Sequence, residues 1–95
     1  MAFVKTATIT SDAGTVYADA TAWIAEHGAC GTENIAFVTE ASIALVAGGT
    51  GVTIALTYAD EAACIAHENA GGTAEIIGNE EIVGTTWTLV SRVAT

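Results

Sequence analysis

The sequence predicts an α+β fold with the element order β-α-β-β-α-β. Four segments alternate apolar and polar residues with the two-residue period of a strand, and two others repeat apolar residues at the helical spacing of three and four. A chain of 95 residues has room for one hydrophobic core, so we expect a single domain over residues 1–95.

The first half of the chain reads as a strand over residues 3–10 followed by a helix over residues 13–27. Ser11 or Asp12 is expected to cap this helix, because a short side-chain oxygen accepts hydrogen bonds from the first helical turn. The face of the strand expected to be buried carries Phe3, Lys5, Ala7 and Ile9. The corresponding face of the helix carries Val16, Ala20, Trp23, Ile24 and His27.

The middle of the chain predicts a β-hairpin. Its strands are expected over residues 34–47 and 52–58, with a glycine-rich turn at residues 48–51, since glycine adopts the positive φ that tight turns need. One face of the first hairpin strand carries Ile35, Phe37, Ala41, Ile43 and Leu45.

The last part of the chain predicts a second helix and a final strand. Asp60 is expected to cap a helix over residues 62–69, and residues 73–77 are expected to form a further helical turn. The strand is expected over residues 82–93, with Val83, Trp87, Leu89 and Val93 on one face.

Joined by right-handed crossovers, these elements give a four-stranded antiparallel sheet with two helices on one face, the ferredoxin-like arrangement. The other face is rich in Thr, Ala and Ser and carries few charges. Such a face suits packing against a second sheet, so we expect a homodimer formed through the sheet face.

This pattern resembles the dimeric α+β barrel superfamily, which includes antibiotic-biosynthesis-type monooxygenases. The local resemblance lies in Thr57-Tyr58 running into Ala59-Asp60-Glu61-Ala62-Ala63-Cys64-Ile65-Ala66-His67. It implies sheet-to-sheet dimers with a pocket between each sheet and its helices. It also implies two activities: haem degradation, with a histidine of the second helix on the iron, or oxygenation of polycyclic aromatic compounds without metal or flavin.

Charge excludes two classes of partner. The net charge is −9, from eleven carboxylates against Lys5 and Arg92, so we expect no binding to nucleic acid or to anionic membranes. We expect a cytoplasmic protein, because the chain shows no signal-peptide pattern and has two cysteines, too few for a disulfide framework. A disulfide between Cys30 and Cys64 is the alternative in an exported chain.

Two Cys/His pairs are the candidate metal ligands. His27, Cys30, Cys64 and His67 together would form the ligand set of a tetrahedral zinc site. Our prediction is no cofactor, with zinc on these residues or haem on His67 as alternatives. Against haem, the first strand lacks the asparagine found in haem-degrading members.

Tyr58 and His67 are the candidate catalytic residues. A pocket for a small apolar ligand would be lined by Trp23, His27, Phe37 and Trp87, although aromatic residues at these spacings are more often part of a core. We therefore predict a binding or structural module, which includes a subunit of a larger assembly such as a virion. The alternative is a cofactor-independent small-molecule monooxygenase or isomerase. Whether the chain is an enzyme stays open at this point.

Overall fold

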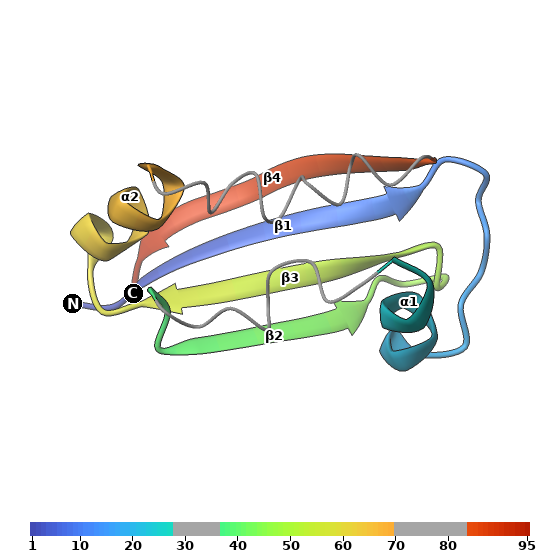
Figure 1. Cartoon of the computed structure of the whole chain (residues 1–95), viewed down its shortest axis with the longest axis horizontal. Helices are drawn as coiled ribbons and strands as arrows, with labels where there is room; N and C mark the ends of the chain where they lie inside the picture. The colour runs from blue at the N-terminus through green and yellow to red at the C-terminus, as the bar shows by residue number, and fades with distance from the viewer. Residues whose placement is uncertain (28–36, 70–83) are drawn as a thin grey trace.

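A computed structural model describes residues 1–27, 37–69 and 84–95 (Figure 1). The elements are β1 (Phe3–Ser11), α1 (Ala20–His27), β2 (Glu40–Leu45), β3 (Gly51–Tyr58), α2 (Glu61–Asn69) and β4 (Thr85–Ala94). The strands form one antiparallel sheet in the order β2-β3-β1-β4. This confirms the predicted ferredoxin-like α+β fold.

Alternation along the strands places the core on one face of the sheet. In β1, Phe3, Lys5, Ala7 and Ile9 are buried and their neighbours are not. The strand register places residues of neighbouring strands on this same face, because Ile9 pairs with Val52 and Val52 pairs with Leu45. The predicted inner faces are therefore correct within β1 and β2, but just before β2 the prediction is wrong, because Val38 is buried and Phe37 is exposed.

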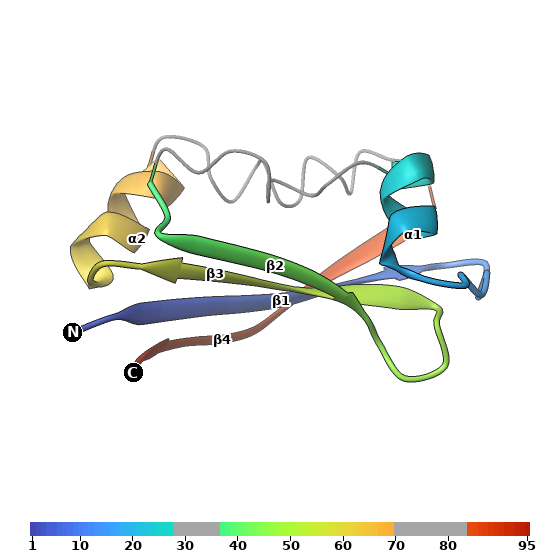
Figure 2. The same ribbon diagram turned by 90° about the horizontal axis from the view of Figure 1, so that it is seen from below.

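Both helices lie on this inner face, but at opposite ends of the sheet (Figure 2). α1 packs against β2 and β3, whereas α2 packs against β1 and β3. The separation follows from the topology, since α1 lies at the end of the sheet where β1 finishes and α2 lies at the end where β3 finishes (Figure 1). Neither helix of the described chain is long and apolar enough to span a bilayer.

The predicted start of the first helix is wrong. The helix begins at Ala20 instead of residue 13, and Asp19 caps it, with the Ala22 amide donating to Asp19 Oδ1 at 2.8 Å. Gly14 has a φ of 71°, a left-handed conformation that interrupts a helix at this point. The chain from Asp12 to Asp19 is therefore a loop.

The glycine-rich turn is confirmed, with positive φ at Gly48 and Gly49. Gly51 follows the turn at a close approach of two backbones, because a Cβ there would lie 2.3 Å from the carbonyl oxygen of Ile9. β2 is shorter than predicted, since it begins at Glu40. The predictions for residues 34–36, 73–77 and 82–83 lie outside the described residues.

A β-bulge in β4 overturns one predicted face. Ala7 pairs with Leu89 but Thr6 pairs with Ser91, so Val90 is an extra residue in β4. The extra residue exchanges the faces of the strand. Beyond it Arg92 pairs with the buried Lys5, and Val93 pairs with Val4 on the opposite face.

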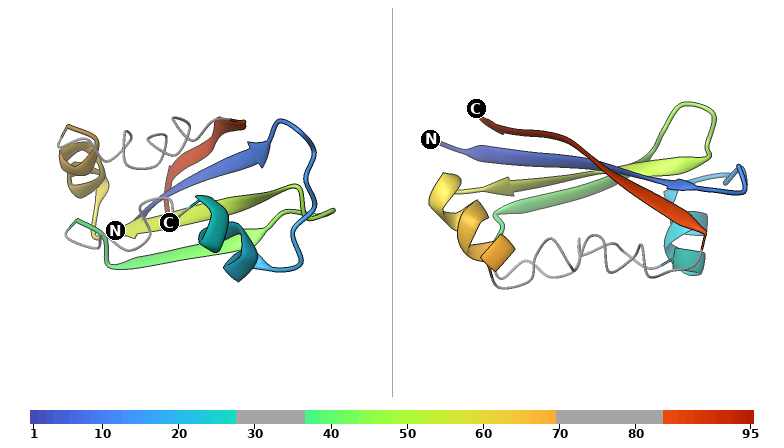
Figure 3. Two further views of the ribbon diagram at one scale, coloured as in Figure 1. Left: turned by 45° about the vertical axis from the view of Figure 1, so that its right-hand side comes forward. Right: turned by 90° about the horizontal axis from the view of Figure 1, so that it is seen from above.

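The face of the sheet away from the helices is called here the outer face. No described element covers it, and Figure 3 shows it as the open side of a twisted sheet. By register it carries Val4, Thr6, Thr8, Thr10, Glu40, Ser42, Ala44, Thr53, Ala55, Thr57, Thr86, Thr88, Ser91 and Val93. Glu40, on the edge strand β2, is the one charged residue among them.

Candidate functional site

The two predicted catalytic residues are in contact. Tyr58 ends β3 and His67 lies on α2, and the Tyr58 hydroxyl is 2.8 Å from His67 Nδ1. The ring of Phe37 stacks on His67 with a centroid separation of 5.0 Å. Tyr58 is 0% exposed and His67 is 1% exposed. We call these three residues the α2 aromatic cluster; its phenol and imidazole can exchange a proton with each other but not directly with solvent.

Beside this cluster, both basic side chains of the sequence meet one carboxylate. Lys5 Nζ lies 3.3 Å from Glu68 Oε2, and an Arg92 guanidinium nitrogen lies 2.8 Å from Glu68 Oε1. Lys5 is buried on the inner face of β1, so Glu68 balances a cation that has left water. Partial burial lowers the pKa of Arg92, but Glu68 and Cys64 together outweigh this effect and raise the pKa overall, so Arg92 stays charged.

Sequence reasoning missed Tyr17, which organises a second cluster at the other end of the sheet. The Tyr17 hydroxyl lies 2.7 Å from His27 Nε2. Trp23 packs against both rings, with its centroid 5.1 Å from that of Tyr17 and 4.3 Å from that of His27. We call Tyr17, Trp23 and His27 the α1 aromatic cluster. Burial raises the pKa of Tyr17, and the Glu26 carboxylate raises it further.

An internal repeat in the sequence would have revealed Tyr17. Tyr17-Ala18-Asp19 before α1 recurs as Tyr58-Ala59-Asp60 before α2. The two aspartates play the same part, since Asp60 Oδ1 accepts from the Ala63 amide at 2.9 Å as Asp19 does from Ala22. Each half of the fold therefore carries a capping aspartate and a buried tyrosine–histidine pair.

The four predicted pocket residues do not form one group. Trp23 and His27 belong to the α1 aromatic cluster, and Phe37 belongs to the α2 aromatic cluster at the opposite end. Trp87 lies on β4, in register with Ile9. Three nitrogens of this set are nevertheless buried without a hydrogen-bond partner among the described residues: Trp23 Nε1, His27 Nδ1 and Trp87 Nε1.

The residues of the zinc alternative are also split between the two ends of the sheet. His27 is on α1, whereas Cys64 and His67 are on α2 at the far end of the sheet. Cys30 lies outside the described residues, and within the described ranges no three Cys, His, Asp or Glu side chains converge as metal ligands. Cys64 carries a free, fully buried thiol.

His67 does not fit the role of a haem ligand. An axial histidine needs one ring nitrogen open to the iron. The His67 side chain is 1% exposed and Phe37 covers one face of its ring, so neither ring nitrogen faces open space. No step of a reaction is therefore derived through haem.

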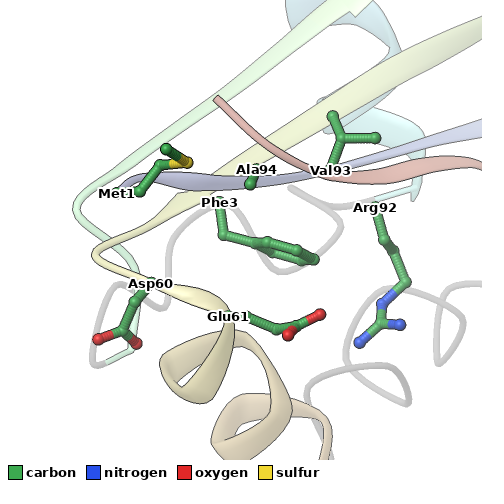
Figure 4. Close-up of a pocket in the computed structure, with 7 residues that line it drawn as sticks. All are labelled: Met1, Phe3, Asp60, Glu61, Arg92, Val93 and Ala94. Carbon is green, nitrogen blue, oxygen red and sulfur yellow. The ribbon is translucent and has the colours of Figure 1, made fainter.

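A pocket of about 560 Å³ lies elsewhere, between the start of α2 and the end of β4 (Figure 4). Its apolar lining comes from Met1, Phe3, Val93 and Ala94, and its charged lining comes from Asp60, Glu61 and Arg92. The volume falls within the range of small-molecule sites. None of the residues predicted for catalysis or for the pocket lines it.

No family model, curated protein or solved structure matches the chain. The candidate site is thus defined by its own geometry, which consists of two buried tyrosine–histidine pairs, an ion triad and a separate pocket. The tyrosine–histidine pairs have the features of structural hydrogen bonds, because in each pair a buried hydroxyl contacts a buried ring nitrogen.

Proposed function

We propose that the chain is a non-catalytic binding or structural module that works as a homodimer, with two sheets packed through their outer faces. The observation that carries the proposal is the charge distribution. The sequence has a net charge of −9, yet Glu40 is the one charged residue on the outer face. Association through any acidic surface would bring like charges together, and the outer face avoids that cost.

The size of the outer face supports the same arrangement. Four strands spaced about 4.8 Å apart and about eight residues long make a surface of roughly 500 Å² on each copy. Two such faces bury about 1,000 Å², near the lower limit for a specific interface. Threonine, alanine and valine dominate the face, and sheets that pack face to face commonly have small or β-branched side chains there.

Membership of the dimeric α+β barrel superfamily is part of this proposal. It is supported by the β-α-β-β-α-β order, the strand order and the placement of both helices on one face. Cytoplasmic location likewise remains a proposal, based on the cysteine content of the sequence.

Analytical ultracentrifugation of the purified chain tests the dimer. We expect a species of twice the chain mass at micromolar concentration. Thr8 lies near the middle of the outer face, so Thr8→Glu should place two carboxylates near the symmetry axis and yield monomers. Thr21→Glu adds the same charge on the exposed side of α1 and should leave the dimer intact. A monomeric wild-type chain, or a dimeric Thr8→Glu variant, would refute the proposal.

The alternative function is a cofactor-independent monooxygenase or isomerase acting on a small aromatic compound. One observation favours it: three of the four predicted pocket residues hold buried nitrogens without a partner in the described part of the chain, and a bound carbonyl or carboxylate could accept from such a nitrogen. The test is oxygen uptake with anthrone as the probe, compared between the wild-type chain and Tyr58→Phe. Catalysis that depends on Tyr58 would favour the enzyme over the non-catalytic module.

A further inference from the structure

The pocket between α2 and β4 combines an apolar floor with charges of both signs. Phe3, Val93 and Ala94 are apolar, Arg92 is the basic group, and Glu61 is the acidic group closest to it in view. Figure 4 shows the Glu61 carboxylate and the Arg92 guanidinium turned toward the same side of the pocket, below the ring of Phe3. Asp60 lies on the far side of Glu61 in that view.

The two opposite charges do not neutralise each other. Within the described residues, Arg92 pairs with Glu68 and not with Glu61. The contact with Glu68 engages one guanidinium nitrogen, whereas a guanidinium presents five N–H donors in a planar fork. Arg92 therefore has donors left for a second carboxylate, and the carboxylate of Glu61 can accept from a cation.

From this arrangement we propose that the pocket binds a small zwitterion with an apolar substituent, of the class of apolar α-amino acids. The ligand carboxylate lies on Arg92, its ammonium group lies on Glu61, and its side chain lies on Phe3. An anion without an ammonium group leaves Glu61 desolvated beside it, and an amine without a carboxylate leaves Arg92 in the same state. The pocket thus disfavours a ligand that carries only the carboxylate or only the ammonium group.

The surrounding structure holds the two charged groups in place. Glu68 fixes the Arg92 side chain, which also lies over the Phe3 ring at 5.8 Å from its centroid. Glu61 is the first residue of α2, whose start is fixed by the Asp60 cap. The ligand charges therefore meet groups that are largely preorganised, which reduces the entropy lost on binding.

Three probes that share a phenyl group test the proposal by isothermal titration calorimetry. They are L-phenylalanine, 3-phenylpropionate, which lacks the ammonium group, and 2-phenylethylamine, which lacks the carboxylate. We expect L-phenylalanine to bind at least tenfold more tightly than either of the others. Equal affinity for all three, or no saturable binding of L-phenylalanine up to about 10 mM, would overturn the proposal, because even millimolar affinity would be detected there.

Two variants assign the binding to this pocket. Glu61→Gln should weaken L-phenylalanine at least tenfold and should tighten the binding of 3-phenylpropionate, because it removes the carboxylate that this anion leaves desolvated. Glu26→Gln removes the same charge from exposed α1, at the opposite end of the sheet, and should change neither affinity. Equal effects of the two substitutions would place the ligand elsewhere and refute the assignment. The dimer is measured separately by its mass, so failure of the ligand proposal and failure of the proposed function are distinguishable.

Discussion

The hydroxyl oxygen of Tyr58 lies 2.8 Å from Nδ1 of His67, and both side chains are shielded from water. This bond joins the last residue of β3 to the last turn of α2, so it fixes α2 against the sheet. Tyr17 and His27 do the same for the loop before α1. Each helix of the described fold is thus secured by a phenol–imidazole contact as well as by apolar packing.

Replacement of Tyr58 by Phe should lower the free energy of unfolding by about 1–2 kcal/mol, because it leaves a buried imidazole nitrogen without its partner. Urea denaturation followed by tryptophan fluorescence measures the loss. Tyr17→Phe is the matched variant at the other end of the sheet and should cost a similar amount. If Tyr58→Phe unfolds at the same urea concentration as the wild type, the bond does not stabilise the fold.

The two capping aspartates give a second prediction. Asp60→Ala should destabilise the chain by about 1 kcal/mol, since the Ala63 amide loses its acceptor. Asp60→Asn keeps a side-chain oxygen in the same place and should retain most of the stability. Thermal unfolding followed by far-UV circular dichroism compares the two variants. A similar loss in Asn and Ala would show that charge, and not the hydrogen bond, is responsible.

The Lys5–Glu68–Arg92 triad gives a third prediction. Glu68→Gln should cost about 2 kcal/mol, less than the roughly 3–5 kcal/mol of a fully buried pair because Glu68 is 25% exposed. Arg92→Gln should cost under about 1 kcal/mol, since Arg92 is 32% exposed and the ion pair between Lys5 and Glu68 remains.

If repulsion among the many carboxylates controlled stability, Arg92→Gln would be the more destabilising substitution. It raises the net negative charge of the chain, whereas Glu68→Gln lowers it. Urea denaturation of both variants at two salt concentrations separates these effects. A larger loss in Arg92→Gln than in Glu68→Gln would contradict the role assigned to buried Lys5.

The raised pKa of Tyr17 predicts that the folded chain loses stability at alkaline pH. Burial and Glu26 raise the pKa of Tyr17 in the folded chain above its ordinary value of about 10. The folded state then holds the phenolic proton more tightly than the unfolded state, so this stability is complete below about pH 10 and is lost as pH rises through the folded pKa. Urea denaturation from pH 8 to about pH 11 should show this fall, and Tyr17→Phe should reduce it. An unchanged slope in Tyr17→Phe would rule out Tyr17 as its origin.

Local sequence patterns were sufficient to predict the strands. The alternation in β1 and β3, the hairpin glycines and the Asp60 cap all depend on neighbouring residues, and each is present in the structure. The start of α1 was mispredicted because Ser11 and Asp12 look like caps, whereas Gly14 adopts a positive φ just after them. The spacing of apolar residues gives no sign that the helix is interrupted at Gly14.

The candidate site was harder to predict because it depends on distances along the sheet. Tyr58 and His67 are nine positions apart, and the short connection between β3 and α2 brings them into contact. Whether His27 approaches Cys64 and His67 depends on which end of the sheet each helix occupies, and residue spacing carries no information on that. The Glu68 triad likewise joins residues from both ends of the sequence.

The extra residue in β4 also affects how the molecule avoids aggregation. β4 is an edge strand with exposed Leu89 and Val90, and the sequence contains no proline to interrupt its hydrogen-bonding groups. A regular strand of this kind could recruit further strands and grow into fibrils. By placing Val90 out of register, the bulge bends this edge and makes it a poor template for a further strand.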